Sequence, residues 1–499
     1  MEKNIETKSL PDNLSGVHIH FVGIKGTGMA ALVEILFHNG AIITGSDVSE
    51  RFYTDEILEK LGLKALSFSE KNITDEIQYV IYSSAYKIDK NPDLIEATRK
   101  KIPCLLYTQA LGSYSSKAYS CGICGVHGKT STTGIVGTIL KEIDLPSQIL
   151  AGSIIRSFGN SCTYTSPLID SSKNNQNNIF VAETCEYQRH FMSFCPKKII
   201  LTSVEPDHED FYPTYEDIRN AFVDYVCLLP KNGDLIYCSD DKGACDVADI
   251  VKQKRSDINF IPYGTSKNSI YKLKFGEVSE EKNRFSVNNF DFAIKMPGKH
   301  EVMDSCAAVA LVCQLLKTFG KNPLDYEKNI ANGLLNFSGG KRRSEIVGEF
   351  TTKLNNSVLV IDDYGHHPTA VKTTLEGFKE FYKGRKIIVD FMSHTYSRTQ
   401  ALLKEFGECF GSADEVILHK IYSSARENPK DFKITGKTLY DEVLKNHKNV
   451  HYFEEVLDAL AFVKSELEKP LSENYNGYLF VTMGAGDNWK IGKEILKNK

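Results

Sequence analysis

Short apolar runs alternate with longer amphipathic segments in the first part of the chain. The apolar runs cover residues 17–22, 41–44 and 79–83, and segments with helical spacing cover residues 54–61 and 92–100. Strands of four to eight residues that alternate with helices are typical of parallel α/β folds. We therefore predict a Rossmann-like first domain.

The same alternation continues through the rest of the chain. It predicts strands at residues 118–124, 179–182, 198–202, 358–361, 386–391, 415–418 and 479–482, with helices at residues 301–316, 370–381 and 398–410. Residues 234–295 interrupt it, because they contain several short strand-like pieces that indicate a β-rich excursion. A chain of 499 residues is expected to form about three domains. We place them at 1–112, 113–340 and 341–499, with the polar stretch 171–178 as an exposed loop.

Composition excludes several classes of function. The formal net charge is -4, which gives no general affinity for nucleic acid or an anionic membrane. No apolar run approaches the roughly 20 residues of a membrane span, and the polar N-terminus has no signal-peptide core. Twelve cysteines with no export signal are typical of reduced thiols in a cytoplasmic protein. Cys121 and Cys124 are predicted to be buried small residues rather than metal ligands.

A glycine turn between a predicted strand and a predicted helix points to nucleotide chemistry. The turn and the helix start read GVHGKTS, which comprises Gly125, Val126, His127, Gly128, Lys129, Thr130 and Ser131. Glycines let backbone N–H groups close around an anion, and the helix N-terminus adds partial positive charge. Lys129 would reach the outer phosphates, and the Thr130 hydroxyl would bind Mg²⁺. The alternative is an ordinary strand–turn–helix that happens to hold Gly-Lys-Thr.

A second glycine-rich turn follows the first predicted strand. Gly26, Gly28 and Ala31 match the dinucleotide-binding spacing, and Asp47 lies 21 residues after Gly26, where an acid that binds ribose is expected. The pattern indicates a nucleotide-like ligand, and an NAD-dependent oxidoreductase is one class of protein that has it. Tight packing of helix on strand would also explain the glycines.

Acidic and histidine side chains follow two further strands of the predicted central sheet. Glu183 ends one strand run, and His208 lies in the acidic loop after another. Because carboxyl ends of parallel strands share one edge, we expect both residues beside the phosphate loop, where they could hold a metal ion. A histidine in an acidic loop is otherwise simply solvated.

Polar clusters follow strands in the last domain as well. Tyr364 and His366 follow one predicted strand, and His394 and Arg398 follow the next. The cluster suggests a ligand with a carboxylate or a phosphate. Arg342 lies in a basic, glycine-rich turn before this domain, where it could hold a phosphate or simply be solvated.

Taken together, these motifs resemble the Mur ligases, the ATP-dependent amino-acid ligases of peptidoglycan precursor synthesis. The resemblance rests on GIKGTGM (23–29), GVHGKTSTT (125–133), EPDH (205–208), PGKH (297–300), KRR (341–343), DDYGHHP (362–368) and GAGD (484–487). It implies a UDP-sugar-binding Rossmann-like domain, a central P-loop ATPase domain and a C-terminal Rossmann-like domain that closes over both with the amino acid. The first and sixth motifs are most similar to members that join L-alanine to UDP-N-acetylmuramate.

The resemblance also implies roles for individual residues. UDP-sugar contacts would be Gly23, Gly26, Gly28, Met29, Asp47 and Ser84. ATP contacts would be residues 125–131 with His300 and Arg342, and amino-acid contacts would be Tyr364, His366, His394 and Arg398. Two Mg²⁺ ions, with Mn²⁺ as an alternative, would bind to Thr130, Glu183 and His208. The catalytic residues would be Lys129, Glu183, His208, His394 and Arg398, in a cytoplasmic monomer or weak homodimer.

The reaction implied by the resemblance passes through an acyl phosphate. The lactyl carboxylate of UDP-N-acetylmuramate attacks the γ-phosphate of ATP, and the amine of L-alanine then displaces phosphate. Several positions depart from the family pattern, namely Lys25 in the first glycine turn, Ser203, Glu301, Asp304 and Thr395. Two alternatives within the family therefore stay open: a ligase that adds a whole tripeptide, and a catalytically silent nucleotide-binding member.

Overall fold

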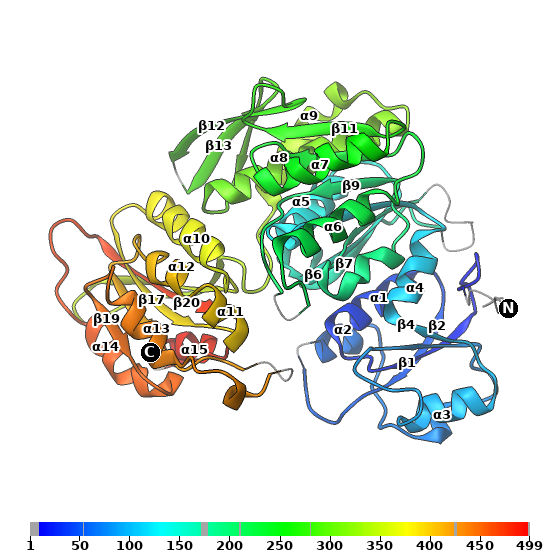
Figure 1. Cartoon of the computed structure of the whole chain (residues 1–499), viewed down its shortest axis with the longest axis horizontal. Coiled ribbons are helices and arrows are strands. Elements are labelled where there is room, and N and C mark those ends of the chain that lie inside the picture. The colour runs from blue at the N-terminus through cyan, green and yellow to red at the C-terminus, as the bar shows by residue number, and fades with distance from the viewer. Residues whose placement is uncertain are drawn as a thin grey trace. The chain divides into compact units, whose positions relative to one another are not determined.

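A computed structural model describes residues 9–52, 54–170, 178–208, 211–279, 281–423 and 427–497 (Figure 1). Its contacts divide the chain into two compact units. Unit 1 comprises Met1–Glu205, Glu216–Lys272 and Cys306–Phe337, and unit 2 comprises Pro206–Tyr215, Leu273–Ser305 and Ser338–Lys499. The predicted loop at 171–178 lies outside the described residues except for Asn178.

The N-terminal part of unit 1 is built on a four-stranded parallel sheet of order β2-β1-β3-β4. Its strands are β1 (His18–Val22), β2 (Ile42–Ser46), β3 (Tyr79–Tyr82) and β4 (Cys104–Leu106), and its helices are α1 (Thr27–His38), α2 (Asp55–Lys60), α3 (Pro92–Arg99) and α4 (Tyr107–Ser115). The predicted strands and helices of this region are confirmed to within a few residues. The carboxyl end of β1 leads directly into the first glycine turn and α1.

A second sheet forms the rest of unit 1. Its strands there are β5 (Tyr119–Cys124), β6 (Ser147–Ile155), β7 (Ser161–Thr165), β8 (Ile179–Glu183), β9 (Lys198–Leu201), β10 (Asp234–Cys238) and β11 (Asn259–Gly264). They lie in the order β11-β10-β9-β5-β8-β6-β7, and only β7 is antiparallel. The helices of this region are α5 (Lys129–Lys141), α6 (Tyr215–Val226), α7 (Lys242–Lys254) and α9 (Glu327–Asn336), together with α8 (Lys299–Thr318) from Cys306 onward. The strands β9, β5 and β8 are neighbours, as the positions of the polar clusters predicted.

The prediction of a β-rich excursion over residues 234–295 is wrong in its first half. Helix α7 lies between β10 and β11, so the parallel β–α–β pattern continues there. The side chain of Asp241 caps this helix by accepting a hydrogen bond from Ala244 N, 2.7 Å away. Ala244, Val247 and Val251 supply its buried face. The second half is confirmed, since β12 (Tyr271–Ser279), β13 (Lys282–Val287) and β14 (Phe290–Ile294) form an antiparallel meander.

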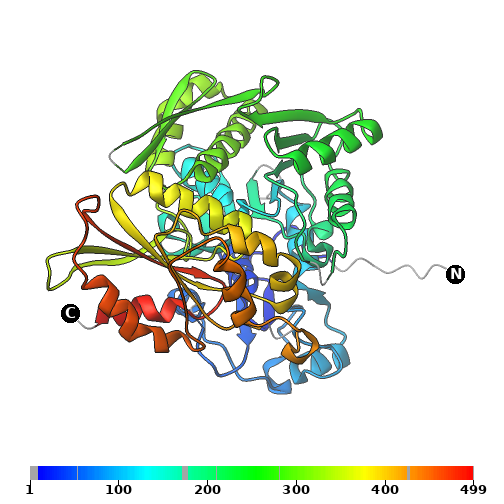
Figure 2. The same cartoon turned by 60° about the vertical axis from the view of Figure 1, so that its left-hand side comes forward.

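Unit 2 contains a six-stranded sheet of order β15-β16-β20-β17-β18-β19. Its strands are β15 (Glu345–Thr351), β16 (Ser357–Asp363), β17 (Arg385–Met392), β18 (Glu415–Leu418), β19 (Val450–Tyr452) and β20 (Gly477–Gly484). Its helices are α10 (Pro368–Phe381), α11 (Tyr396–Ala401), α12 (Leu403–Glu408), α13 (Gly436–Val443), α14 (Leu460–Leu467) and α15 (Trp489–Lys497). Helices cover both faces of this sheet (Figures 1 and 2): α10, α12 and α13 pack on one face, and α14 and α15 pack on the other.

The predicted helix over 398–410 is interrupted. Leu402 leaves the helical conformation with φ -111° and ψ 27°, so α11 and α12 are separate helices. The strands β15 and β19 and the helices α13, α14 and α15 were not predicted from the sequence.

The prediction that Cys121 and Cys124 are buried is confirmed. Cys121 and Cys124 are fully buried in β5, and all twelve cysteines of the chain are free thiols. Burial raises the pKa of the Cys121 thiol to about 12, so it stays protonated at neutral pH. Among the helices that the structure describes, none combines the length and the hydropathy that a membrane crossing requires.

A buried ion pair lies at the carboxyl edge of the unit 2 sheet. His419 Nε2 lies 3.0 Å from Asp390 Oδ2, and both side chains are fully buried. Asn488 Nδ2 donates to the second oxygen of Asp390 at 3.1 Å. Burial alone would lower the pKa of His419, but the charge and the hydrogen bond of Asp390 outweigh burial and raise it.

This ion pair predicts a pH dependence of stability. A raised folded-state pKa means that the stabilisation is complete below about pH 6.5, the unfolded value, and is lost as pH rises through the folded-state pKa. The free energy of unfolding, measured with denaturant from pH 6 to 9, should therefore decline as pH rises. His419→Gln and Asp390→Asn should both remove this decline. The assignment would be wrong if His419→Gln kept the wild-type slope.

Candidate functional site

The phosphate loop is a turn that only glycines can make. Gly125 follows β5 with φ +134°, and a Cβ added there would lie 2.0 Å from Thr202 Oγ1. Gly128 has φ +79° and forms the N-cap of α5, so the helix begins at Lys129. Positive φ favours glycine, and the close approach at Gly125 leaves no room for a side chain. The loop therefore leads straight from the strand end to the helix N-terminus.

The segment that follows the neighbouring strand β9 holds this loop in place. Val126 N donates to Ser203 O, and His127 N donates to Ser203 Oγ, each at 3.0 Å. Ser203 stands where the family pattern has asparagine, and its hydroxyl makes a hydrogen bond to the loop backbone. The departure therefore leaves the loop anchored to β9.

Lys129 is held over the loop by backbone and carboxylate oxygens. Its Nζ lies 2.5 Å from Gly125 O and 3.1 Å from Glu186 Oε1. Burial alone would lower the pKa of Lys129, but the carboxylates of Glu186 and Glu183 outweigh burial and raise it. Lys129 is therefore a fixed positive charge. Glu186 is nearly fully buried, and the sequence analysis gave it no role.

Thr130 and Glu183 meet at the first turn of α5. Thr130 Oγ1 donates to Glu183 Oε2 at 2.9 Å, and Gly152 N donates to the same oxygen at 2.7 Å. A Cβ on Gly152 would lie 2.6 Å from this carboxylate, so a side chain there would displace the carboxylate from its present position. A hydroxyl beside a carboxylate is a pair of hard oxygen donors of the kind that Mg²⁺ prefers. The two residues fit the predicted magnesium site.

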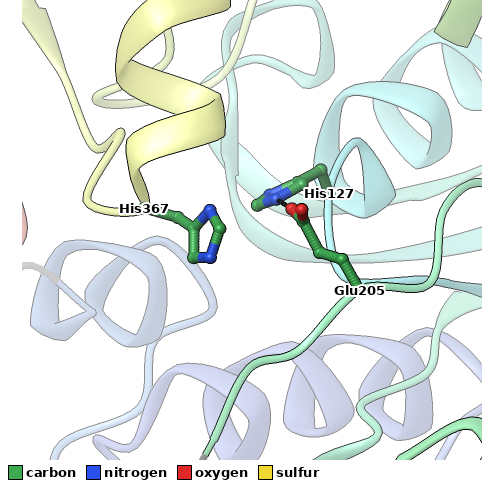
Figure 3. Close-up of side chains that lie close together, drawn as sticks. All are labelled: His127, Glu205 and His367. Atoms are coloured by element: carbon green, nitrogen blue, oxygen red, sulfur yellow. Dashed lines mark hydrogen bonds and ion pairs between the residues drawn. The ribbon is translucent and has the colours of Figure 1, made fainter. Parts of the chain in front are cut away.

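His127 pairs with an acid rather than projecting into solvent. Figure 3 shows its ring directed toward the carboxylate of Glu205, with a short contact between Nε2 and Oε1. Ser131 follows on α5 and is largely buried. Residues 125–128 therefore form the turn and residues 129–131 begin α5, while the side chain of His127 is bound by Glu205 in the segment after β9.

The first glycine turn has a similar construction in the first domain. Gly23 has φ +85°, and a Cβ there would lie 2.6 Å from the Tyr86 ring. Gly26 N donates to Gly23 O at 3.2 Å, and Gly26 is the N-cap of α1. A Cβ on Gly28 would lie 2.9 Å from the Tyr107 ring. Met29 is buried on α1, so its side chain faces the core.

Asp47 is occupied by protein donors. Its two oxygens accept hydrogen bonds from Lys25 N at 2.7 Å, Val48 N at 2.8 Å and Tyr86 Oη at 3.0 Å. The carboxylate therefore joins the glycine turn, the end of β2 and the segment after β3. Ser84, in that last segment, is exposed.

Four residues predicted to bind the amino acid lie together in unit 2. The ring centroids of Tyr364 and His366 are 5.0 Å apart, and those of His366 and His394 are 5.8 Å apart. Arg398 Nη1 donates to His394 O at 3.4 Å. Burial and the positive charge of Arg398 hold the pKa of His366 well below its usual value. The cluster thus presents a neutral imidazole beside a guanidinium.

The guanidinium of Arg398 is bound by a carboxylate that the sequence analysis did not assign. Its Nη2 and Nε donate to Asp207 Oδ1 at 2.7 and 3.2 Å, and both side chains are buried. Burial alone would raise the pKa of Asp207, but Arg398 and His208 outweigh burial and lower it strongly. His208 Nε2 lies 3.8 Å from Asp207 Oδ2. The position of Asp207 beside His208 was the only sequence signal for this pair.

A second carboxylate fixes the helix that carries Arg398. Glu427 accepts hydrogen bonds from Tyr396 N at 2.7 Å and Ser397 N at 3.2 Å, the first two N–H groups of α11. An acid at this position satisfies donors that the helix leaves unpaired and complements its dipole. Thr395, the N-cap, has φ +67°. The orientation of Arg398 therefore depends on Glu427 as well as on Asp207.

Arg342 and His300 lie elsewhere in unit 2. Arg342 Nε donates to Asp362 Oδ2 at 2.8 Å and Nη2 to Gly484 O at 2.7 Å, so its guanidinium joins the basic turn to the ends of β16 and β20. His300 lies in the first turn of α8, 4.0 Å from the Glu301 carboxylate. Glu301, one of the departures from the family pattern, is nearly fully buried.

Comparison with known proteins gives the same family over the whole chain. Three family models match: "Mur ligase family, catalytic domain" over residues 18–119, "Mur ligase middle domain" over 123–312 and "Mur ligase, glutamate ligase domain" over 342–486. UDP-N-acetylmuramate–L-alanine ligase of Treponema pallidum is 44% identical over 98% of both chains. That of Borreliella burgdorferi is 38% identical over 95% of this chain and 97% of its own. In fold, the chain is similar to the UDP-N-acetylmuramate–alanine ligase MurC of Thermotoga maritima, with a TM-score of 0.71, 24% identity and coverage of 96% and 98%.

The buried pair of Arg398 and Asp207 predicts a large loss of stability on truncation. Arg398→Met leaves the carboxylate of Asp207 buried without its partner, so we expect a loss of about 3–5 kcal/mol in the free energy of unfolding. The control is Arg99→Met, which removes an exposed guanidinium from Glu96 and should leave the free energy of unfolding nearly unchanged. Equal denaturant midpoints for the two variants would contradict this account.

Proposed function

The chain belongs to the Mur ligase family and joins L-alanine to UDP-N-acetylmuramate in peptidoglycan precursor synthesis, and we propose that it does so through an acyl phosphate formed at the phosphate loop. The observation that carries this mechanism is the group of charges at the carboxyl edge of β5 and β8. Lys129 is a fixed cation there, and Thr130 and Glu183 supply a hydroxyl and a carboxylate. These are the groups that transfer of a γ-phosphate requires.

In the first step, an oxygen of the lactyl carboxylate attacks the γ-phosphorus of ATP, and the bond to the β,γ-bridging oxygen breaks to release ADP. An anion attacks a triphosphate slowly unless charge is neutralised and the reactants are held in line. The N–H groups at the N-terminus of α5 and the ammonium of Lys129 face the phosphates in this proposal. Glu186 keeps Lys129 charged and in place.

In the second step, the amine of L-alanine attacks the acyl carbon, and phosphate leaves after a tetrahedral intermediate. The amine must lose a proton to become a nucleophile. We propose that Tyr364, His366 and His394 surround the amino acid, because their rings lie together. The neutral imidazole of His366 suits a site that must hold a deprotonated amine. Arg398 would bind the alanine carboxylate in competition with Asp207, which already accepts its hydrogen bonds.

Mg²⁺ is the ion that suits these donors, and Mn²⁺ is an alternative. We propose Thr130 and Glu183 as the residues that hold one ion and His208 as a residue that holds a second. A bound divalent cation neutralises phosphate charge and orients the transferred group.

The UDP-sugar is assigned to the first domain. We propose that Gly23, Gly26 and Gly28 let the diphosphate approach the N-terminus of α1, with Met29 and Ser84 nearby. Asp47 contributes to UDP-sugar binding indirectly, since it fixes the first glycine turn through its hydrogen bond from Lys25 N. His300 is assigned to ATP, whereas the hydrogen bonds of Arg342 favour an indirect role in shaping the basic turn.

The domain boundaries at 112/113 and 340/341 stay predictions, as do the monomer or weak homodimer and the cytoplasmic location. A reaction that consumes ATP fits the cytoplasm, and none of the three substrates is a nucleic acid or a membrane component.

Phosphate release tests the proposed reaction. Purified protein with ATP, Mg²⁺ and UDP-N-acetylmuramate should release phosphate only when L-alanine is added, and chelation of the metal should abolish release. Release that requires the tripeptide instead would identify the tripeptide-adding ligase. No release with any acceptor, together with measurable ATP binding, would identify a silent family member.

Lys129→Ala tests the phosphate loop. Loss of the cation at the γ-phosphate should lower kcat by about a hundred-fold or more and leave the Kd for UDP-N-acetylmuramate nearly unchanged. Lys141→Ala is the matched control, because Lys141 ends the same helix and contacts only Ser157 O among the hydrogen bonds described for it. Wild-type turnover by Lys129→Ala would refute the assignment.

A further inference from the structure

Lys25 is a buried lysine at one of the positions that depart from the family pattern. It lies in the first glycine turn between β1 and α1, and its exposed fraction is only 8%. Its Nζ lies 3.0 Å from Val48 O, 2.8 Å from Glu50 O and 3.2 Å from Asp55 Oδ1. A charge buried to this extent is tolerated only when it is paired and hydrogen-bonded. Lys25 meets this condition through the segment that follows β2.

The backbone of Lys25 is tied to the same segment at both of its ends. Lys25 N donates to Asp47 Oδ2 at 2.7 Å, at the start of the segment, and Thr54 Oγ1 donates to Lys25 O at 2.5 Å, at its end. Main chain and side chain together therefore connect the glycine turn to residues 47–55 at five atoms of that segment. Tyr53 lies outside the described residues.

The tied segment forms one wall of a cavity. The cavity has a volume of about 560 Å³ and is lined by Lys25, by residues 47–49 and 51, by Asp55, Leu58 and Glu59 of α2, and by residues 62–67. Its lining is half apolar, with Leu58, Leu63 and Leu66 among the apolar residues. Lys25 is its lining residue from the glycine turn, to which the proposed function assigns the diphosphate.

We propose that Lys25 is a positioning residue for the UDP-sugar: it holds residues 47–52, 54 and 55 against the glycine turn, so that the nucleotide end of the substrate enters a pocket that is already formed. This inference rests on the proposed function. A segment that is ordered before binding does not lose conformational freedom on binding, and this saving appears as affinity.

The geometry distinguishes this role from direct binding of a phosphate. An ammonium has three N–H donors, and Lys25 has three acceptors at hydrogen-bond distance, namely two backbone carbonyls and one carboxylate. All three donors are therefore used inside the protein. The lysine acts on the ligand through the segment that it holds.

Calorimetric titration of the full chain with UDP-N-acetylmuramate and with UDP tests the inference. Lys25→Met keeps the length of the aliphatic stem and removes the three donors. We expect it to raise both dissociation constants about ten-fold, since each ligand carries the nucleotide end. In turnover, the KM for the UDP-sugar should rise by a similar factor, while kcat and the KM for ATP change by about two-fold or less.

The matched control is Lys100→Met. Lys100 Nζ also binds one backbone carbonyl and one carboxylate in the first domain, Ile73 O and Asp75 Oδ1, each at 2.7 Å, but it does not line the cavity. Lys100→Met should lower the free energy of unfolding and leave the dissociation constants for UDP-N-acetylmuramate and UDP unchanged. Lys25→Arg should restore part of the affinity. Asp55→Asn, which weakens one of the three contacts, should raise the constants about two- to three-fold and serves if Lys25→Met does not fold.

The outcomes separate the inference from the function on which it rests. Tight binding by the wild type with unchanged constants for Lys25→Met and Asp55→Asn would overturn the role of Lys25 alone. Loss of kcat at unchanged KM would also overturn it. Failure of the wild type to bind either UDP ligand would overturn the assignment of the first domain, and the inference with it.

Discussion

The contact between the phosphate loop and the segment after β9 is the constraint on which the catalytic edge depends. Gly125 approaches Thr202 so closely that no side chain fits, and Ser203 receives two backbone N–H groups of the loop. Because β9, β5 and β8 are adjacent parallel strands, this contact also fixes where Lys129 meets the acids that follow β8. The backbones at the carboxyl ends of β9, β5 and β8 therefore position the side chains that are proposed to act on ATP.

Three of the cations that the sequence pattern singled out are each paired with a carboxylate of the protein itself. Lys129 pairs with Glu186, Arg398 with Asp207 and Arg342 with Asp362. Partly buried charges need such partners, since an isolated charge away from water is strongly unfavourable. Under the proposed assignment, an anionic substrate that binds any one of these cations must rearrange its ion pair. In the proposed mechanism, Mg²⁺ would offset the negative charge that the triphosphate brings to the central domain.

Much of the fold could be predicted from the sequence, because apolar strand runs and glycine turns have strong local signals. The phosphate loop, the order of strand-end clusters and the ring cluster of Tyr364, His366 and His394 follow from such signals. Partners that meet only in three dimensions could not be predicted: Glu186, Asp207 and Glu427 are ordinary acids in the sequence. Helix α7 was not predicted because strand-like pieces surround it, although its N-cap Asp241 is a local helix signal. Neither proline nor glycine lies at Leu402 or next to it, so the sequence has no local signal for the helix break there.

The ion pair of Arg398 and Asp207 has a consequence for inhibitor design. A compound that offers a carboxylate to this guanidinium must displace an internal acid that is covalently part of the protein and always at high local concentration. The measured affinity of such a compound includes the cost of displacing Asp207, so it would be lower than its contact with Arg398 alone would give. Neutral groups that pack against the neighbouring aromatic rings break no ion pair, so they gain affinity without this competition. Under the proposed assignment of this cluster to the amino acid, an analogue without the carboxylate avoids this competition.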